Sequence, residues 1–209
     1  MIYYSQAQHT FFDDQIHDSV PDDAQAITAE QHRQLLDALN YGHAIAEDLT
    51  VHPRPSPAHQ WQPESQSWKL DPARAAVLAA EQLAQAKTAK LAALNAAAQA
   101  YIDRAAGIDQ LPDFEVRTWT LQALEAKAWA ADNSAATPTL DTIAAARSIP
   151  PDILKQKALA KALAYEQLTA TVVGLRQAIE TRIKQAADMA ELEAIEFAFG
   201  TGGDAEAET

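Results

Sequence analysis

Hydrophobic residues follow two different patterns along the chain, and the change falls near residue 69. Ahead of it, apolar residues form short aromatic and β-branched runs, of which Ile2-Tyr3-Tyr4-Ser5 and Thr10-Phe11-Phe12 are the first, with polar residues between them. Runs of this kind favour strands joined in a hairpin. Beyond residue 69, larger apolar residues recur every three or four positions in alanine-rich sequence, which is the period of an amphipathic helix. The pattern predicts a small strand-containing module followed by a mainly helical remainder.

The first 50 residues also contain signals for a further strand and a helix. Ala26-Ile27-Thr28 fits a short strand, and Thr28 stands three residues before Gln31, which is the spacing of a capping box. Leucines follow at helical spacing, and Gly42 is suited to end the helix because glycine readily adopts a positive φ. We therefore expect residues 1–50 to form a small α+β domain.

Residues 51–70 combine prolines with two tryptophans. The prolines at alternate positions from 53 to 57 exclude a helix and favour an extended, semi-rigid arm. Trp61 and Trp68 flank a four-residue turn signal between two short extended pieces. Two roles stay open for these tryptophans: they fill the core of the module, as aromatic residues usually do in small domains, or they contact a partner.

Asp71-Pro72 has the form of a helix start, with an aspartate cap and proline at the first helical position. The helix is expected to reach about Ala106, where Gly107 ends it, so a connector at 71–107 would be about 50 Å long. Its small and apolar residues follow the alternating steps of a heptad seam, interrupted at Lys87. The seam comprises Ala73, Val77, Ala80, Ala84, Leu91, Leu94, Ala98, Tyr101 and Ala105. Because alanine buries little surface, we expect this helix either to project or to pair closely with another.

Residues 108–199 are predicted to form a helical domain. Helix starts stand at Pro112-Asp113, Thr137-Pro138 and Pro150-Pro151, and a cap-like Asp188 precedes a short terminal helix. The last long helix carries a second seam of three-four spacing, interrupted at Lys161. Its members are Leu154, Ala158, Tyr165, Leu168, Val172, Leu175 and Ile179.

The segment 200–209 is small and acidic, which predicts disorder. For the whole chain the patterns predict a mainly α fold with a small N-terminal α+β module, in which long helices with heptad seams form a C-terminal helical bundle. Either seam could also support self-association, because heptad seams pair readily with a further helix.

Charge is distributed unevenly along the chain. Residues 1–68 hold ten acidic residues against Arg33 and Arg54, a balance of −8, and the whole chain carries −13. Clustered basic residues drive binding to phosphates, so we expect no nucleic-acid partner and no anionic membrane partner. The chain has no cysteine, no evident secretory signal and no apolar stretch of spanning length. We therefore expect a soluble, cytoplasmic protein.

No catalytic motif stands out in the sequence. The six glycines are too dispersed for a phosphate-binding loop, and neither a nucleophile elbow nor a His-Glu-x-x-His helix is present. All six histidines lie ahead of residue 69, and His9, His17, His52 and His59 share that module with several aspartates. None of their spacings matches an established zinc motif, so structural or surface histidines are favoured over a metal site. A pH-responsive surface is a third interpretation. We predict no enzymatic activity, no metal and no cofactor.

Residues near the N-terminus match the order and spacing of a known family. The matching positions are Tyr3-Tyr4-Ser5, Phe11-Phe12, Ile16-His17, Pro21-Asp22-Asp23-Ala24, Ile27-Thr28, Glu30-Gln31-His32, Leu35-Leu36 and Gly42, followed by the proline-rich segment. In these residues the chain resembles bacteriophage tail-fibre assembly proteins, chaperones that also occur beside the fibres of phage-derived contractile bacteriocins (tailocins). Family members often have glycine ahead of the aromatic pair, where this chain has Gln8-His9-Thr10. That departure leaves the geometry of the hairpin turn open.

A second resemblance lies in the C-terminal half. The segment from Thr137 to Ile195 is similar to a helical domain of unknown function found in phage proteins. The residues that carry it are Thr137-Pro138-x-Leu140-Asp141, Ala144-Ala145-Ala146-Arg147, Gly174-x-Arg176-Gln177-Ala178 and Glu191-Leu192-Glu193-Ala194-Ile195. Neither set of motifs is catalytic, and no family function is carried onto the helix at 71–107.

The N-terminal resemblance implies a chaperone that binds the C-terminal tip of a trimeric phage or tailocin tail fibre and promotes its folding and trimerisation. It would act in the bacterial host cytosol and in some cases stay on the particle. Fibre tips are rich in non-local β pairing, which folds slowly and exposes strand edges. A module with its own strands could cover such an edge. The expected contacts are aromatic: Tyr4, Phe12, Trp61 and Trp68. The alternative is a structural tail-tip subunit or a coiled-coil adaptor.

Overall fold

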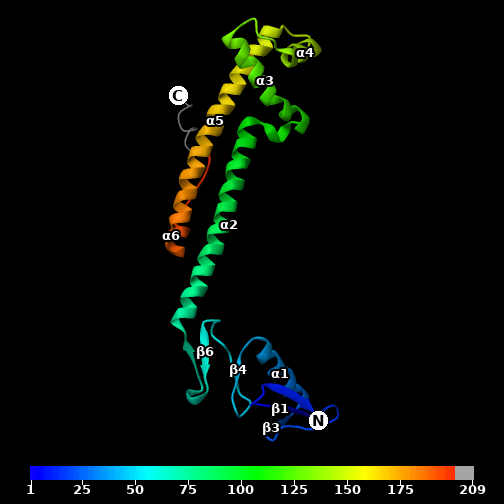
Figure 1. Cartoon of the computed structure of the whole chain (residues 1–209), viewed down its shortest axis with the longest axis vertical. Helices are drawn as coiled ribbons and strands as arrows, with labels where there is room; N and C mark the ends of the chain where they lie inside the picture. Colours follow the sequence, from blue (N-terminus) through cyan, green and yellow to red (C-terminus); the bar gives the residue numbers. More distant parts are fainter. Residues whose placement is uncertain (201–209) are drawn as a thin grey trace, which may run out of the picture. The chain divides into compact units, whose positions relative to one another are not determined.

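The computed structural model describes residues 1–200, so all of the predicted disordered tail except Gly200 lies outside the described residues. The chain forms two compact units, Met1–Gln82 and Leu83–Thr209. The division falls within helix α2 (Pro72–Ala106). Among the described residues, every strand belongs to the first unit (Figure 1).

A three-stranded antiparallel sheet is the centre of the N-terminal unit. Its strands, in the spatial order β2-β1-β3, are β1 (Ile2–Ser5), β2 (Thr10–Asp13) and β3 (Ala24–Ile27). Tyr3 lies opposite Phe12, and Tyr4 lies opposite Phe11. Because side chains alternate along a strand, these two pairs point to opposite faces of the sheet. The predicted hairpin and the third short strand are confirmed.

Helix α1 (Ala29–Asn40) packs on the face of the sheet that carries Tyr4. The buried cluster between helix and sheet comprises Tyr4, Ile27, Leu35, Ala38 and Ile45. The helix begins with the predicted capping box. The Thr28 hydroxyl accepts from the Gln31 N–H at 3.1 Å, and the Gln31 side chain accepts from the Thr28 N–H at 2.9 Å. Local capping and the apolar face of the helix therefore specify the same element.

The end of α1 also follows the prediction. Gly42 has a φ of +69°, a left-handed conformation that glycine adopts without steric cost. The N–H groups of Gly42 and His43 donate to the carbonyls of Leu39 and Ala38, at 3.0 and 2.8 Å. This pair of bonds closes the last turn of the helix and directs the chain toward the next strand.

The structure shows the geometry of the turn between β1 and β2, which the sequence leaves open because the turn lacks the glycine that is usual in the family. His9 has a φ of +48°, so a non-glycine residue occupies the left-handed region there. The His9 Nδ1 atom lies 3.1 Å from the hydroxyl of Tyr4, within hydrogen-bonding distance. The imidazole thus gains a local partner in a backbone conformation for which glycine is the usual residue.

Half of the proline- and tryptophan-rich segment, residues 51–70, lies in short strands. Strand β4 (Ala44–Ile45) pairs with β5 (Val51–His52), and β6 (His59–Gln62) pairs with β7 (Ser67–Leu70) across the 3₁₀ turn η1 (Pro63–Ser65). Trp61 lies directly opposite Trp68, which confirms the turn predicted between them. Within residues 51–70, only 53–58 and Gln66 lie outside a strand or a 3₁₀ turn, so most of the segment expected as an extended arm is hairpin.

The C-terminal unit consists of helices. After α2 and the 3₁₀ turn η2 (Ile108–Gln110) come α3 (Asp113–Ala131), α4 (Pro138–Ala146), α5 (Pro151–Gln185) and α6 (Met189–Glu193). The predicted starts at Pro112, Pro138 and Pro151 are confirmed. Gly107 ends α2 with a φ of +66°, and the Asp188 carboxylate accepts from the Glu191 N–H at 2.8 Å to cap α6.

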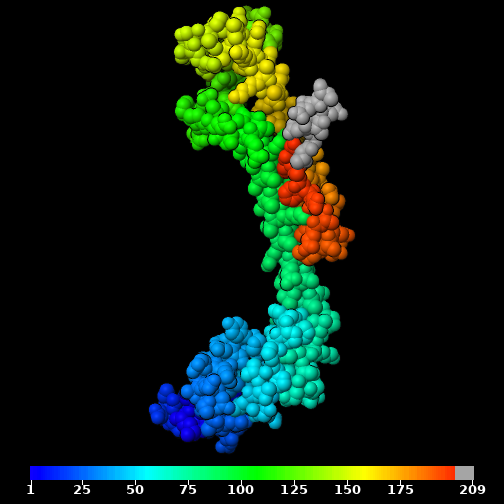
Figure 2. All heavy atoms as spheres, turned by 180° about the vertical axis from the view of Figure 1, so that it is seen from behind, coloured from blue at the N-terminus to red at the C-terminus, as the bar shows by residue number. Residues whose placement is uncertain are grey.

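Two buried clusters stabilise this unit. The first lies among α3, α4 and α5 and comprises Ala126, Leu140, Ala144 and Leu154. The second lies among α2, the C-terminal part of α5, and α6 with the residues after it, and comprises Leu94, Ile183, Ala186, Leu192 and Ile195. Figure 2 shows α6 and the residues that follow it, in red, against α5 and α2. The Lys87 ammonium donates to the Lys184 carbonyl at 2.9 Å across the same contact.

The predicted seams are correct in part. In α2, the positions from Leu91 to Tyr101 are buried or half-buried, but Val77 is 57% exposed and the seam alanines around it are exposed as well. In α5 the seam is buried or half-buried apart from Leu175, which is 51% exposed, and Lys161. A seam is buried only where a second helix reaches it, and the sequence period alone does not supply that information.

The chain is thus mainly α, with a small N-terminal α+β module and long helices in a C-terminal bundle, as predicted. No helix within residues 1–200 is both long and apolar enough to cross a membrane.

Candidate partner-binding surfaces

Of the four residues predicted to contact a partner, Tyr4 is a core residue. Its side chain is fully buried between the sheet and α1, and its ring lies 5.2 Å from that of Phe11. Burial also raises the pKa of the Tyr4 hydroxyl. The expectation that Tyr4 forms a contact surface is wrong, because strand alternation turns its ring toward the helix.

Phe12 lies on the opposite face of the sheet and is half-buried. Its ring packs edge-on against His17 at 5.3 Å between centroids. His17 Nδ1 in turn accepts from the backbone N–H of Asp13 at 3.1 Å. The face therefore presents part of the Phe12 ring, held in place by a local turn.

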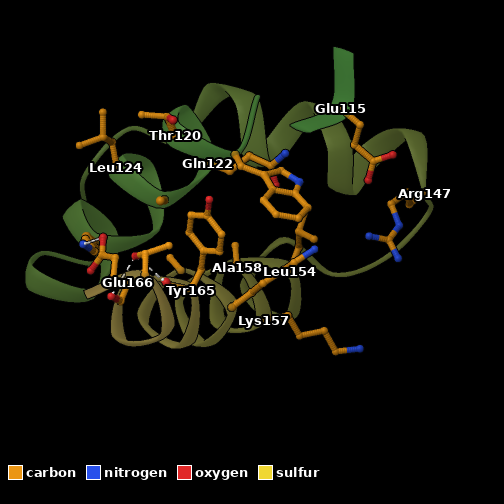
Figure 3. Close-up of a pocket in the computed structure, with 16 residues that line it drawn as sticks. Glu115, Thr120, Gln122, Leu124, Arg147, Leu154, Lys157, Ala158, Tyr165 and Glu166 are labelled. Atoms are coloured by element: carbon orange, nitrogen blue, oxygen red, sulfur yellow. Dashed lines mark hydrogen bonds and ion pairs between the residues drawn. The ribbon is translucent and has the colours of Figure 1, made fainter. Parts of the chain in front are cut away.

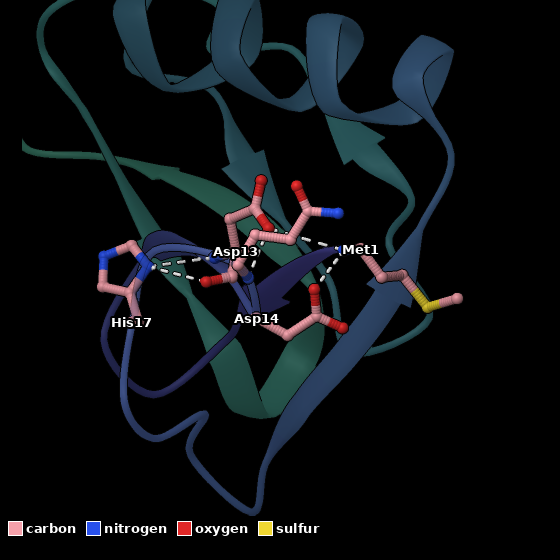
Figure 4. A network of polar contacts seen from close by, with 5 residues as sticks. Met1, Asp13, Asp14 and His17 are labelled. Carbon is pink, nitrogen blue, oxygen red and sulfur yellow. Dashed lines mark hydrogen bonds and ion pairs between the residues drawn. The ribbon is translucent and has the colours of Figure 1, made fainter.

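Acidic groups surround the end of β2 (Figure 4). The ammonium group of Met1 forms ion pairs with the carboxylates of Asp13 and Asp14. The backbone N–H of Gln15 donates to Asp13 at 2.9 Å, which lowers the pKa of that carboxyl group, and the Met1 ammonium lowers it further. These contacts fix the C-terminal end of β2. They leave the outer backbone edge of β2 open to pairing with another strand.

Both outer strands of the sheet are edges. Neither β2 nor β3 pairs with a further strand among the described residues. Edge strands present unpaired N–H and C=O groups, which favour pairing with a strand from another chain. The four-residue length of each strand limits such an added strand to a few backbone bonds.

Trp61 and Trp68 form a pair on the β6-β7 hairpin. Their rings meet edge to face at 5.4 Å between centroids, and both side chains are half-buried. The Trp68 indole N–H donates to the His52 carbonyl at 3.2 Å, and the guanidinium carbon of Arg54 lies 5.8 Å from the Trp68 ring centroid. The hairpin is thus anchored to β5, while part of each ring stays accessible.

These two tryptophans line a cavity of about 470 Å³ in the N-terminal unit. Gln6 and His9 from the β1-β2 turn line it as well, together with residues 42–47 around β4. The pocket, here called the tryptophan pocket, therefore joins the sheet to the hairpin. Of the four predicted contact residues it includes Trp61 and Trp68, and it includes neither Tyr4 nor Phe12.

The histidines are placed by individual local contacts. His43 Nδ1 accepts from the backbone N–H of Arg54 at 3.0 Å, and His59 Nδ1 lies 2.8 Å from the Ser56 hydroxyl. The His32 ring packs edge-on against Phe11 at 4.6 Å. Within residues 1–200, no group of three or more His, Cys, Asp or Glu side chains is placed to hold a metal ion.

A second cavity, of about 400 Å³, lies between α3 and α5 in the C-terminal unit (Figure 3). The rings of Trp119 and Tyr165 meet edge to face at 6.0 Å, and the Lys161 ammonium lies 3.8 Å from the Trp119 ring centroid. Lys127 and Glu166 form an ion pair across it. Lys161 interrupts the α5 seam in the sequence. This interruption is a sequence signal for the cavity, and our prediction of contact residues missed the cavity.

Comparisons with known proteins bear on the C-terminal unit alone. A model of the HI1402 helical domain matches residues 160–197, which cover most of α5 together with α6. The matched stretch supplies Ile183, Leu192 and Ile195 to the cluster that packs against α2. No curated protein and no solved structure matches the chain.

Proposed function

We propose that this protein is a chaperone that binds the C-terminal tip of a phage or tailocin tail-fibre polypeptide and promotes its folding and trimerisation. The observation that supports the proposal best is the tryptophan pocket. It places two partly accessible aromatic rings beside a small sheet whose outer strands are both edges. The residues of that unit are also the ones that resemble tail-fibre assembly proteins.

The physical need is specific to β-rich fibre tips. Their strands pair across chains, so each polypeptide exposes strand edges until three copies meet, and such edges aggregate. A short strand added along β2 or β3 would cover one edge, and aromatic side chains beside it would supply contact area. The limited length of β2 and β3 favours a contact that can be released, because few backbone bonds would form.

One observation favours a structural role as the second candidate. Val77 and the seam alanines beside it are exposed, and they continue the period of the buried part of the α2 seam. A coiled-coil adaptor or tail-tip subunit would cover such a stripe with another helix. In that case the protein would be found at fixed stoichiometry in finished particles.

The test is co-expression of the full chain with a tail-fibre polypeptide from the same genome, followed by sizing of the complex. The proposal expects soluble, trimeric fibre with the chaperone and aggregated fibre without it. The double variant Trp61→Ala/Trp68→Ala should lower the yield of trimeric fibre. Trp129→Ala, which removes an indole from α3, is the matched control and should leave that yield unchanged.

Fibre that trimerises normally with the Trp61→Ala/Trp68→Ala variant would refute the contact surface. Fibre that trimerises normally in the absence of the whole chain would refute the chaperone role. Purified particles that contain this chain in a constant ratio to fibre, together with fibre that folds without it, would support the structural alternative.

A further inference from the structure

Only one of the two polar atoms in the Gln6 side-chain amide has a hydrogen-bond partner. Its Nε2 atom donates to the Ile45 carbonyl of β4 at 2.5 Å. Its Oε1 atom is buried and has no hydrogen-bond partner, and it is the one buried side-chain nitrogen or oxygen in this condition among the described residues. Exchanging the amide atoms would bring two oxygens together at Ile45, so the orientation is fixed. Gln6 is one of the residues that line the tryptophan pocket, so this unpaired acceptor belongs to a side chain of the pocket wall.

The other walls of the pocket suit a cation. Trp61 and Trp68 line it with aromatic rings, whose faces attract positive charge. The guanidinium carbon of Arg54 lies 5.8 Å from the Trp68 ring centroid, so this ring already has one cation of its own unit nearby. Glu47 is among the lining residues, whereas no lysine or arginine is. Residues 1–68 carry a net −8, so the surrounding field favours a positive group as well.

We propose that the tryptophan pocket binds an arginine side chain of the partner polypeptide. Its guanidinium would donate to Gln6 Oε1, lie against the indole rings and be neutralised by Glu47. Arginine suits these walls better than lysine, because its planar guanidinium stacks on aromatic rings, has five N–H donors and is less strongly hydrated. That the partner is a fibre polypeptide rests on the function proposed above. That the pocket recognises arginine rests on the residues of the pocket alone.

The direct test is a titration of the full-length protein, followed by the side-chain amide signal of Gln6 and the indole signals in NMR spectra at pH 8, above the usual titration range of histidine. The probes are three blocked tripeptides with arginine, lysine or citrulline between two glycines. Citrulline keeps the shape of arginine and removes its charge. The arginine peptide should shift the Gln6 and Trp61 signals. At equal concentration, the lysine peptide should produce smaller shifts and the citrulline peptide none. Free arginine, as a fourth probe, tests whether the flanking peptide contributes.

Variants of the full chain locate the site. Gln6→Leu should weaken binding of the arginine peptide by about tenfold or more, because a hydrogen bond to a charged group is lost. Glu47→Gln should weaken it by a smaller factor without disturbing the bond from Gln6 to Ile45, and it keeps the test valid if Gln6→Leu fails to fold. The control Glu64→Gln removes an acid of the same unit that is not a lining residue.

Three outcomes would overturn the proposal: citrulline and arginine peptides that bind equally, binding that Glu47→Gln and Gln6→Leu leave unchanged, or signals that do not move at all. Failure of the proposed function has a different signature. If the arginine peptide binds as expected but fails to compete with fibre for the protein in the co-expression complex, the pocket is retained and the fibre is not its ligand.

Discussion

The carboxylate of Glu125 in α3 accepts a hydrogen bond from the backbone N–H of Leu140 at 2.9 Å, and both residues are buried. Its other oxygen accepts from the Thr139 N–H at 3.1 Å. These N–H groups belong to the first turn of α4, where they have no partner within their own helix. A side chain from the preceding helix therefore caps α4, and its negative charge suits the positive end of that helix.

Replacing Glu125 by alanine should destabilise the C-terminal unit by about 2–4 kcal/mol, because one buried and one part-buried donor lose their acceptor. Glu125→Gln retains one acceptor oxygen and should cost less. The free energy of unfolding in urea, followed by circular dichroism, checks both values. Glu196→Ala, at an exposed position outside the clusters, is the control and should stay within about 0.5 kcal/mol of the parent. Equal losses in all three variants would contradict the capping role.

Tyr4 and Phe12 lie on opposite faces of the same hairpin, so their substitutions should have separable effects. Tyr4→Phe keeps the ring in the core and removes the contact with His9, which should cost about 1 kcal/mol of stability and leave fibre capture unchanged. Phe12→Ser should weaken fibre capture, with only a small effect on the thermal stability of the protein. Capture and thermal unfolding of the two purified variants check this. A loss of capture in Tyr4→Phe alone would reverse the assignment of the faces.

The carboxylate of Asp23 should make the N-terminal unit sensitive to acid. It accepts from the backbone N–H of Ala7 at 2.9 Å and from the hydroxyl of buried Ser5 at 2.7 Å, and these bonds lower its pKa. A carboxyl group with a lowered folded-state pKa stabilises the fold fully above its unfolded pKa, near 4, and this stabilisation is lost as the pH falls toward the folded value.

Asp23→Asn should therefore differ most from the parent protein at pH 5 and above. The difference in unfolding free energy between the two should shrink as the pH is lowered below about 4. Denaturant titrations over this pH range provide the measurement, with Asp22→Asn as the control because Asp22 makes no such bonds in the structure. A difference that stays constant across the range would show that the bonds do not depend on the charge of Asp23.

The sequence was most informative where structure is local. Thr28 with Gln31, and Gly42 after α1, each act within one turn of helix, and all three were correctly placed. The face of a strand is not local in the same sense. The sequence predicts a contact surface at Tyr4. The position of α1 decides which aromatic ring of the sheet is covered, and the sequence pattern does not give that position.

The tryptophan pocket and the Glu125 cap depend on contacts between distant parts of the sequence. Gln6 and Ile45 are brought together by the β1-β2 turn and the end of α1, and neither residue has an unusual neighbourhood in the sequence. Glu125 sits in the middle of a helix, where a charged residue usually faces solvent. Its partners lie 14 and 15 residues away, so no periodicity identifies it.

The two halves of α2 (Pro72–Ala106) should respond differently to the same kind of substitution. Leu94 is fully buried against α5 and α6, and Leu94→Ala should cost about 3–5 kcal/mol because it leaves a cavity that the helices cannot close. Val77 is 57% exposed, so Val77→Ala should change the free energy of unfolding by no more than about 0.5 kcal/mol in dilute protein. If another helix covers Val77 in solution, Val77→Ala would instead lower stability in a manner that depends on protein concentration. Unfolding curves at two protein concentrations, with sizing of both variants, separate a bare stripe from a self-association surface.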